Sequence, residues 1–395
     1  MPVLKWRPRS MTAWTVATLV LLVVAGAGVS ACARPRGATR TYYIAADEVD
    51  WDYAPADSDL TMGQPLPAAK FAMVNVPGVV ARVFHKAVYR EYTDSTFTTL
   101  KPRPAKWQHL GILGPVLRGA VGDTIVVVFR NNTQFPTSVH PHGVFYAKGS
   151  EGALYDDGTS GTDKADDAVP QGGTARYVWP IPERAGPGPD QPSSIMWPYH
   201  SHTHELADFQ SGLVGAIIVT RRGMARPDGS PKDVDREFVT LFASFDENAS
   251  NYYHENLKHF VGDTTRMGPD GPRLFGKNTA GTYHTINGYM YGNLPLASLA
   301  MHVGEHVRWY VFSGTGFDDY HSPHWHGNTV VVRNAREDVL NLGAPLVAFT
   351  ADMVPDDPGT WLFHCHFGEH MEDGMSARYR VVPRDSALVA DPGRR

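Results

Sequence analysis

Four short clusters hold eleven of the 18 histidines in this 395-residue chain. The clusters consist of His140 and His142; His200, His202 and His204; His321, His324 and His326; and His364, His366 and His370. Each cluster contains a His-x-His pair, and an extended strand points residues i and i+2 to the same face. One such pair is usually explained by local hydrogen bonds. Four pairs predict a fold that directs imidazoles toward metal ions.

The rest of the chain has the pattern of an all-β protein. Short runs rich in Val, Ile, Phe and Tyr alternate with Gly, Pro, Asn and Asp, and no long stretch has helical periodicity. This pattern predicts Greek-key β-sandwiches. We expect strands at residues 121–130, 213–220, 237–243, 307–312, 328–333 and 377–382.

The chain also repeats itself, which predicts two copies of one sandwich. A Val-Gly-Asp or Val-Gly-Glu turn at 121–123 and 303–305 precedes the His-x-His-Gly motifs at 140–143 and 324–327. The segments 197–202 and 361–366 also match: each begins with Trp, ends with a His-x-His pair and precedes a Gly. We expect one domain at 40–222, a second at 233–384 and a polar tail at 385–395, and the length suits two domains.

The N-terminus predicts export. Basic residues precede an apolar stretch at 13–31, which is typical of a signal segment, so we assign residues 1–32 to export. Val29-Ser30-Ala31-Cys32 resembles a lipobox, whose acylated cysteine would attach the chain to a membrane face. Ordinary cleavage nearby and an uncleaved anchor are the alternatives. Each places the protein at the periplasmic or extracellular face. The net charge of -5 gives no indication of a nucleic-acid partner.

The residues around Cys365 give the most specific signal. A His-Cys-His motif at 364–366 is followed by His370 and Met375. With His321 upstream, they supply the two imidazoles, thiolate and axial thioether of a blue copper site. Structural zinc normally uses four closed Cys/His ligands, which leaves Met375 and the other clusters unexplained. The histidines flanking Cys365 point away from it on an extended strand and can bind other metal ions.

These motifs resemble the multicopper oxidases from about Thr41 to Val382, most sharply the ceruloplasmin and hephaestin branch. The likeness to that branch is carried by Tyr42-Tyr43-Ile44-Ala45-Ala46, Trp51-Asp52-Tyr53-Ala54, Glu91-Tyr92-Thr93-Asp94, Glu151-Gly152-Ala153, Phe245-Asp246-Glu247-Asn248 and Ile286-Asn287-Gly288. The resemblance implies cupredoxin-like domains. It also implies that a small donor delivers electrons to a type 1 copper, and that a trinuclear copper cluster reduces O2 to water.

The same resemblance assigns twelve copper ligands for one type 1, one type 2 and two type 3 coppers. His321, Cys365, His370 and Met375 are assigned to type 1, His140 and His324 to type 2, His142, His200 and His366 to one type 3, and His202, His326 and His364 to the other. Ser201 stands where the first domain's own type 1 cysteine would be, with Leu213 near the axial position. We therefore expect no blue copper in that domain.

The resemblance also suggests two residues that act near the cluster. Glu151 matches an acid that moves protons to oxygen, with an ordinary surface carboxylate as the alternative. Tyr146 matches a tyrosine that can serve as a redox reserve, although a packing tyrosine explains it equally well. His204 has no matching ligand and is expected to lie outside the metal sites.

The donor is less constrained by the sequence. Glu369 sits where the branch has an acid lining its iron site, and His284 matches another iron-site residue. The partner glutamate is replaced by Thr279, and acids such as Glu255, Asp318 and Asp319 would have to compensate. This incomplete carboxylate set favours a phenolic, laccase-like donor slightly over Fe(II) or Cu(I).

Two other classes of copper protein are less favoured. One is a copper storage or electron-carrier protein that never reduces oxygen, and a carrier needs only one copper. A nitrite reductase uses a lone type 2 copper and keeps its blue copper in the first domain. The two type 3 ligand sets and Ser201 argue against a nitrite reductase.

The positions of the cluster ligands predict an oligomer. Four cluster histidines come from each domain, so the cluster must lie at a domain interface. The animal proteins of the branch that the chain resembles have six cupredoxin domains, and they form that interface between their first and last domains. A two-domain chain can close the same ring as a homotrimer, with each cluster between the first domain of one subunit and the second domain of its neighbour.

Overall fold

The computed structural model describes residues 37–71, 81–262, 281–316 and 320–388. These described residues belong to one compact unit. Cys32 and the predicted export segment lie outside the described residues, as do Thr279, Asp318 and Asp319. In the described ranges, no helix is long and apolar enough to cross a membrane.

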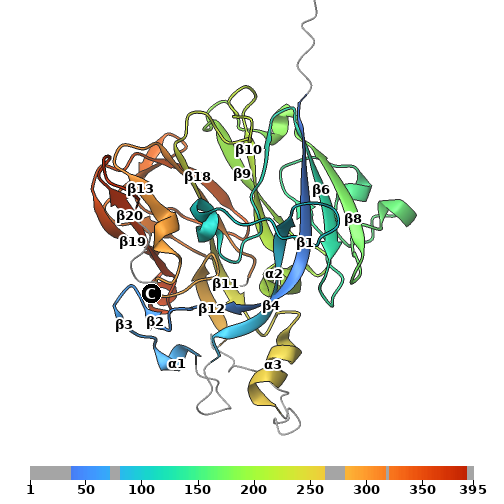
Figure 1. Ribbon diagram of the computed structural model, residues 1–395, viewed down its shortest axis with the longest axis horizontal. Coiled ribbons are helices and arrows are strands. Elements are labelled where there is room, and N and C mark those ends of the chain that lie inside the picture. The colour runs from blue at the N-terminus through green and yellow to red at the C-terminus, as the bar shows by residue number, and fades with distance from the viewer. Residues whose placement is uncertain (1–36, 72–80, 263–280, 317–319, 389–395) are drawn as a thin grey trace, which may run out of the picture. The chain divides into compact units, whose positions relative to one another are not determined.

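Two four-stranded sheets form a first sandwich between residues 39 and 220 (Figure 1). The first sheet has the order β4-β1-β6-β8, with β4 (Val83–Tyr92), β1 (Thr39–Asp52), β6 (Thr124–Asn131) and β8 (Thr174–Pro180). The second has the order β5-β10-β9-β7, with β5 (Leu117–Ala120), β10 (Val214–Thr220), β9 (Ser194–His200) and β7 (His140–Pro141).

A six-stranded and a four-stranded sheet form a second sandwich between residues 236 and 382. The larger sheet has the order β12 (Thr282–Ile286), β11 (Arg236–Asp246), β14 (Val307–Ser313), β18 (Ala348–Met353), β16 (Val330–Val332) and β17 (Ala335–Glu337). The smaller has the order β13 (Ala300–His302), β20 (Ser376–Val382), β19 (Gly359–Cys365) and β15 (Pro323–Trp325).

Short elements connect these strands. They are the ribbon of β2 (Ser58–Asp59) and β3 (Gln64–Pro65); the α-helices α1 (Ala68–Phe71), α2 (Glu205–Ser211), α3 (Tyr253–Val261) and α4 (Gly368–Glu372); and the 3-10 helices η1 (Ala105–Leu110), η2 (Lys148–Ser150), η3 (Gly161–Asp163), η4 (Glu183–Ala185) and η6 (Leu296–Leu299). The nine-residue α3 was not expected from the sequence.

The two sandwiches repeat one topology. The order β4-β1-β6-β8 corresponds to β12-β11-β14-β18, and β5-β10-β9-β7 corresponds to β13-β20-β19-β15. The register repeats as well, since His140 pairs with His200 and His324 pairs with His364. The all-β, cupredoxin-like prediction is confirmed. The domain boundaries stay a prediction, because one hydrophobic cluster draws side chains from both sandwiches.

The expected strands lie close to the observed ones, with one clear difference. The expected strand at 328–333 is reduced to β16, because Arg333 and Asn334 adopt left-handed backbone conformations with φ of 49° and 64°. Left-handed residues end a strand and form the turn into β17.

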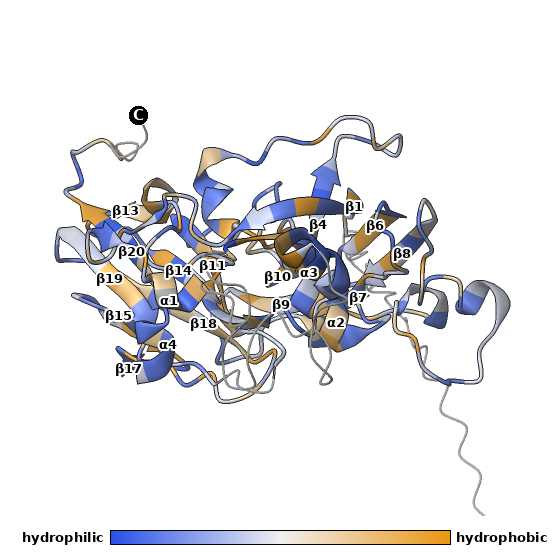
Figure 2. Cartoon of the chain, turned by 90° about the horizontal axis from the view of Figure 1, so that it is seen from below, coloured by the Kyte–Doolittle hydropathy of each residue, from blue (hydrophilic) through white to orange (hydrophobic). Residues whose placement is uncertain are grey.

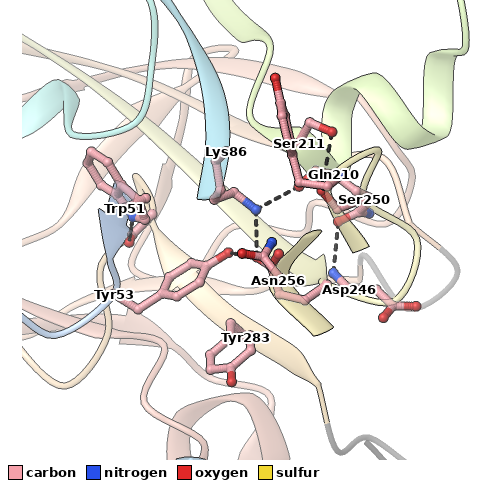
Figure 3. Close-up of polar contacts among 12 residues, drawn as sticks. Trp51, Tyr53, Lys86, Gln210, Ser211, Asp246, Ser250, Asn256 and Tyr283 are labelled. Carbon is pink, nitrogen blue, oxygen red and sulfur yellow. Dashed lines mark hydrogen bonds and ion pairs between the residues drawn. The ribbon is translucent and has the colours of Figure 1, made fainter. Parts of the chain in front are cut away.

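A buried ion pair ties the two sandwiches together. Lys86 of β4 and Glu247, which follows β11, are both fully buried, and the lysine Nζ lies 2.5 Å from a carboxylate oxygen. Lys86 also donates to the carbonyl oxygen of Gln210 at 2.7 Å, and the Tyr53 hydroxyl donates to the Glu247 carboxylate (Figure 3). Burial lowers the pKa of Lys86, and Glu247 opposes that effect.

We expect Lys86→Met to lower the free energy of unfolding by about 3–5 kcal/mol, because it leaves the Glu247 carboxylate buried without its cation. Urea unfolding of the metal-free protein measures this change. The double variant Lys86→Met/Glu247→Gln, which removes both charges, should recover part of the loss. Equal stability of Lys86→Met and the wild type would show that the pair does not hold the sandwiches together.

Candidate metal centre

Three predicted ligands from the second sandwich converge on one point. The ligand atoms of His321, Cys365 and His370 all lie within 4.8 Å of one another, and the three residues are buried. The Nδ1 atoms of the two histidines are 3.2 Å apart, and Cys365 Sγ lies 3.9 Å from His370 Nδ1. Strand β19 ends at Cys365 and α4 carries His370, so the strand-to-helix turn brings thiol and imidazole together.

The backbone brings Met375 to the same site. The Cys365 N–H donates to the Met375 carbonyl oxygen at 3.1 Å, and the Met375 N–H donates to the His370 carbonyl oxygen at 2.8 Å. Met375 is fully buried in the hydrophobic cluster that contains Cys365. The turn therefore supplies a thiolate, an imidazole and a thioether to one part of the core.

The electrostatics of the Cys365 thiol fit a metal ligand. Burial raises its pKa, but hydrogen bonds with His321, His370 and the Ser322 N–H outweigh burial and lower the pKa to about 6. The thiolate is the form of cysteine that binds metals. Two imidazoles, a thiolate and a nearby thioether suit a blue copper ion.

Met375→Leu tests the axial position. Leucine keeps most of the buried volume but removes the thioether sulfur. We expect copper-loaded Met375→Leu to keep its blue absorption and fold, and to show a raised reduction potential, because the axial ligand tunes this potential. Redox titration of the visible band measures it. A potential equal to that of the wild type would remove Met375 from the axial role.

Four histidines of the first sandwich form a second group, which lies at β7 and the end of β9. The rings of His140, His142, His200 and His202 contact one another, with centroids 5.1–5.7 Å apart. The Nε2 atoms of His142 and His200 are 3.0 Å apart. The Nδ1–H groups of His140 and His200 donate to the carbonyl oxygens of Glu151 and Ser201 at 2.7 and 3.0 Å. These hydrogen bonds leave both Nε2 lone pairs for a metal ion.

A matching group lies in the second sandwich, at β15 and the end of β19. Ligand atoms of His324, His326 and His364 lie within 4.8 Å of one another, and the His366 ring contacts those of His324 and His364. The Nε2 atoms of His326 and His364 are 3.1 Å apart, and His364 Nδ1–H donates to the Cys365 carbonyl oxygen at 2.7 Å. The resemblance assigns His326 and His364 to one type 3 copper, and His142 and His200 to the other.

Burial holds three of these imidazoles, those of His142, His200 and His364, in the neutral form that binds metals. Burial, followed by repulsion from neighbouring histidines, lowers the pKa of His142 to about 4. Burial also lowers the pKa of His364 to about 4. The pKa of His200 is lowered well below its ordinary value for the same reason.

The two four-histidine groups do not meet within one chain. Among the described residues, ring contacts connect histidines inside each group and none connects one group with the other. Figure 2 shows β15 and β19 at the left of the chain, β9 near its middle and β7 further to the right. A single chain therefore presents two half-sites, which we name the first and second half-site.

The residues expected to assist the cluster lie beside the first half-site. The Tyr146 ring is 5.9 Å from the His140 ring. The Glu151 carboxylate lies 2.5 Å from Lys148 Nζ and accepts a hydrogen bond from the Tyr155 hydroxyl at 3.2 Å. His204 is exposed and precedes α2, outside the half-site. The roles of Glu151 and Tyr146 stay predictions.

His284 covers the Cys365 centre from β12. Its ring stacks on that of His370 with centroids 4.1 Å apart, and Ser244 Oγ lies 2.8 Å from its Nδ1. Burial lowers the pKa of His284 to about 2. Its Nε2 is 3.8 Å from the carboxylate of Asp373, a residue that was not expected at this site from the sequence. No motif in the sequence marks Asp373.

The acids around this centre differ in their partners. Asp373 is paired with Lys70 at 2.5 Å. Glu369 is exposed at the start of α4 and makes no ion pair within the described ranges. Glu255 accepts a hydrogen bond from Gln134 of the first sandwich, 2.7 Å away. Glu369 is therefore an exposed acid that directly precedes His370 in the chain.

The sequence is similar to known proteins over most of its length. Two family models, both described as multicopper oxidase, match residues 92–223 and 266–385. The chain is 41% identical to "Ferroxidase HEPHL1" of Homo sapiens over 87% of its own length and 29% of that protein. It is 39% identical to human hephaestin and 35% identical to human ceruloplasmin, over 90% and 88% of its length. It spans 30% and 31% of those two proteins.

Solved structures show the same fold at low sequence identity. "Multicopper Oxidase mgLAC" is similar with a TM-score of 0.56 and 17% identity, covering 90% of this chain and 89% of that one. "Blue Copper Oxidase from Nitrosomonas europaea" is similar with a TM-score of 0.53 and 15% identity, covering 87% and 86%.

Proposed function

The chain belongs to the multicopper oxidase family, and from this premise we propose that it oxidises a small donor at the Cys365 centre and reduces O2 to water at the joined half-sites. Copper bound by these residues would supply the one-electron oxidations and the four-electron reduction of O2. We propose one type 1, one type 2 and two type 3 coppers per chain. The observation that carries the proposal is the His-Cys-His motif at 364–366, which contributes adjacent residues to both ligand groups.

The chain's own contribution is to hold these ligands and connect them. Cys365 supplies the thiolate of the proposed type 1 site. The peptide bonds to its neighbours, His364 and His366, lead directly to the second half-site. The hydrogen bond from His364 Nδ1–H to the Cys365 carbonyl oxygen, at 2.7 Å, adds a second connection and fixes the orientation of the imidazole. Near the first half-site, we assign Glu151 to proton delivery and Tyr146 to redox reserve.

The separation of the half-sites supports assembly as a homotrimer. Each half-site supplies four imidazoles, and the assigned copper sites draw ligands from both. A head-to-tail contact between subunits would join the first half-site of one copy to the second half-site of its neighbour, and three such contacts close a ring. We further propose that residues 1–32 direct export, and that acylation of Cys32 would attach the trimer to a membrane face.

For the donor, we propose Fe(II). The sequence alone favours a phenol slightly, because the carboxylate set is incomplete. In the folded chain, however, His284 lies stacked on His370 with Asp373 beside it, and Glu369 is exposed next to the same ligand. The ferroxidase name of the HEPHL1 relative agrees with this choice. A phenolic donor is the alternative outcome of the test.

Glu369→Ala should lower turnover of the copper-loaded protein with Fe(II) by roughly 5 to 150-fold, the effect of losing an interaction worth about 1–3 kcal/mol. Turnover with a bulky phenol should stay near that of the wild type, because a phenol carries no positive charge. Oxygen uptake with each donor, measured side by side, gives both rates.

Glu372→Ala is the matched control, since Glu372 is an exposed acid on the same helix. It should leave both rates unchanged. Equal losses with both donors in Glu369→Ala would contradict the Fe(II) proposal. An absence of oxygen uptake with either donor in the copper-loaded wild type would contradict the oxidase function itself.

A further inference from the structure

The first sandwich repeats the turn that surrounds Cys365, but without its metal-binding side chains. The Ser201 N–H donates to the Leu213 carbonyl oxygen at 3.2 Å, as the Cys365 N–H donates to that of Met375 at 3.1 Å. The Leu213 N–H donates to the Asp208 carbonyl oxygen at 3.2 Å, as the Met375 N–H donates to that of His370 at 2.8 Å. Asp208 therefore takes the place of His370 in this turn.

The upstream ligand position repeats too. Thr137 forms an isolated bridge with Val169, as His321 does with Leu342. The next residue completes the match: the Ser138 N–H donates to Ser201 Oγ at 3.0 Å, and the Ser322 N–H donates to Cys365 Sγ at 3.3 Å.

In the first sandwich, the hydrogen bonds of Asp208 occupy the place that corresponds to the type 1 site of the second sandwich. Asp208 is fully buried. One of its carboxylate oxygens accepts the Ser201 hydroxyl at 2.6 Å and the His204 N–H at 2.9 Å. The other accepts the side-chain amide of Asn251 at 2.8 Å. Charge-assisted hydrogen bonds of this kind are stronger than neutral ones.

This cluster leads directly to the first half-site. Ser201 lies between His200 and His202 in the chain. Its Oγ accepts the Ser138 N–H, while Ser138 Oγ accepts the His202 N–H at 3.0 Å and donates to the Gly152 carbonyl oxygen at 2.6 Å. The backbone that carries His202 is therefore held by a chain of hydrogen bonds that starts at Asp208.

Helix α2, which carries Asp208, is also held near its C-terminal end, at Gln210. Lys86 donates to the carbonyl oxygen of Gln210, as Figure 3 shows. The Gln210 side chain donates to the Thr315 carbonyl oxygen at 2.8 Å and accepts the Asp246 N–H at 2.8 Å, and both partners belong to the second sandwich. Gln210 therefore fixes the C-terminal part of α2, and the His204 N–H holds its start through the bond to Asp208.

We propose that Asp208 is a positioning residue: acting through Ser201, it holds His200 and His202 in place for metal binding. Its hydrogen-bonded cluster replaces the metal that fixes the equivalent turn around Cys365. The inference rests on the proposed function, because it takes His200 and His202 as cluster ligands.

Asp208→Ala removes the acceptor of the Ser201 hydroxyl. We expect cluster copper to bind roughly 10 to 100-fold more weakly, the usual effect of losing a partner that orients metal ligands. Competition with a copper chelator, followed by copper counting, measures this affinity. The blue absorption of Cys365 should be kept, which shows that the second sandwich is folded. Asp208→Asn, which retains an oxygen acceptor for Ser201, should recover most of the affinity.

Two further variants separate positioning from a general effect on folding. Ser201→Ala should reproduce the loss, and the double variant Ser201→Ala/Asp208→Ala should lose less than the sum of the two single losses, because Asp208 acts on the ligands through Ser201. Asp123→Asn is the matched control: Asp123 is a buried acid of the same sandwich that accepts the Ala38 and Ala120 N–H groups, and its variant should bind cluster copper normally.

Wild-type affinity in Asp208→Ala, or additive losses in the double variant, would overturn the inference. If Asp208→Ala fails to fold, Ser201→Ala and Asp208→Asn test the inference in its place. Wild-type affinity for cluster copper in Ser201→Ala would overturn the inference equally. If the wild type itself binds copper at Cys365 and nowhere else, the proposed function fails, and that result is distinct from all of these.

Discussion

Cys365→Ser is expected to remove the blue absorption completely and to reduce steady-state oxidation of every donor to background. The intense visible band of a blue copper site arises from charge transfer between the thiolate and Cu(II), and a serine hydroxyl does not supply it. Donor electrons would also lose their entry point. The variant should retain its fold, because the serine is smaller than the buried cysteine and the Cys365 N–H bond to Met375 belongs to the backbone. Visible absorption and oxygen uptake of the copper-loaded protein measure both effects.

The chain offers a control for this substitution. Cys32→Ser replaces the other cysteine of the sequence and should leave both the colour and the turnover unchanged. Residual blue colour together with normal turnover in Cys365→Ser would show that this thiolate is not the electron entry site.

The sequence was sufficient to predict the fold class and to single out the histidine clusters, because both depend on local patterns, while their role as copper ligands stays a prediction. Alternation within strands orients side chains at i and i+2 alike, so the sequence alone placed each His-x-His pair on one face of a strand. The internal repeat then indicated that one sandwich occurs twice. Sheet order and the pairing of His140 with His200 and of His324 with His364 confirm this repeat.

Other features depend on residues that meet only after folding. Lys86 and Glu247 are 161 positions apart and come together in the shared core. Asp208 and Asn251 are 43 positions apart and belong to different sandwiches. Glu247 lies in a segment that carries the family likeness, but no motif in the sequence links Lys86 with Glu247 or Asp208 with Asn251. The stacking of His284 on His370 is of the same kind, since packing of β12 against α4 creates it.

Turn geometry limited the prediction of strand ends. The expected strand at 328–333 continued through Arg333, which the structure places in a left-handed turn conformation. Arginine seldom marks such turns, so composition gave no signal there.

The Asp208 turn was missed for a related reason. It contains two more residues between Ser201 and Leu213 than its counterpart has between Cys365 and Met375, and alignment by spacing alone therefore obscures the match between Asp208 and His370.

The second large effect concerns assembly, and it tests the central claim that the oxygen-reducing centre is shared between subunits. His140→Ala/His142→Ala destroys the first half-site, and His364→Ala/His366→Ala destroys the second. Each variant alone should be inactive. In a ring of head-to-tail contacts, every mixed trimer contains one contact in which both half-sites are intact. Random mixing makes about three quarters of the trimers mixed, so roughly one quarter of wild-type activity should return.

The control mixes two variants with the same half-site destroyed. His140→Ala/His142→Ala combined with His200→Ala/His202→Ala should remain inactive, because no contact in their mixed trimers has an intact first half-site.

The decisive measurement is oxygen uptake by mixed trimers, produced by coexpressing the two complementary variants with different affinity tags and purified through both tags. We expect activity of about one third of the wild type per purified mixed trimer, because one of its three contacts is intact. Mixed trimers with full blue absorption and no oxygen uptake would contradict a shared centre, as would a wild-type monomer that reduces oxygen at the full rate.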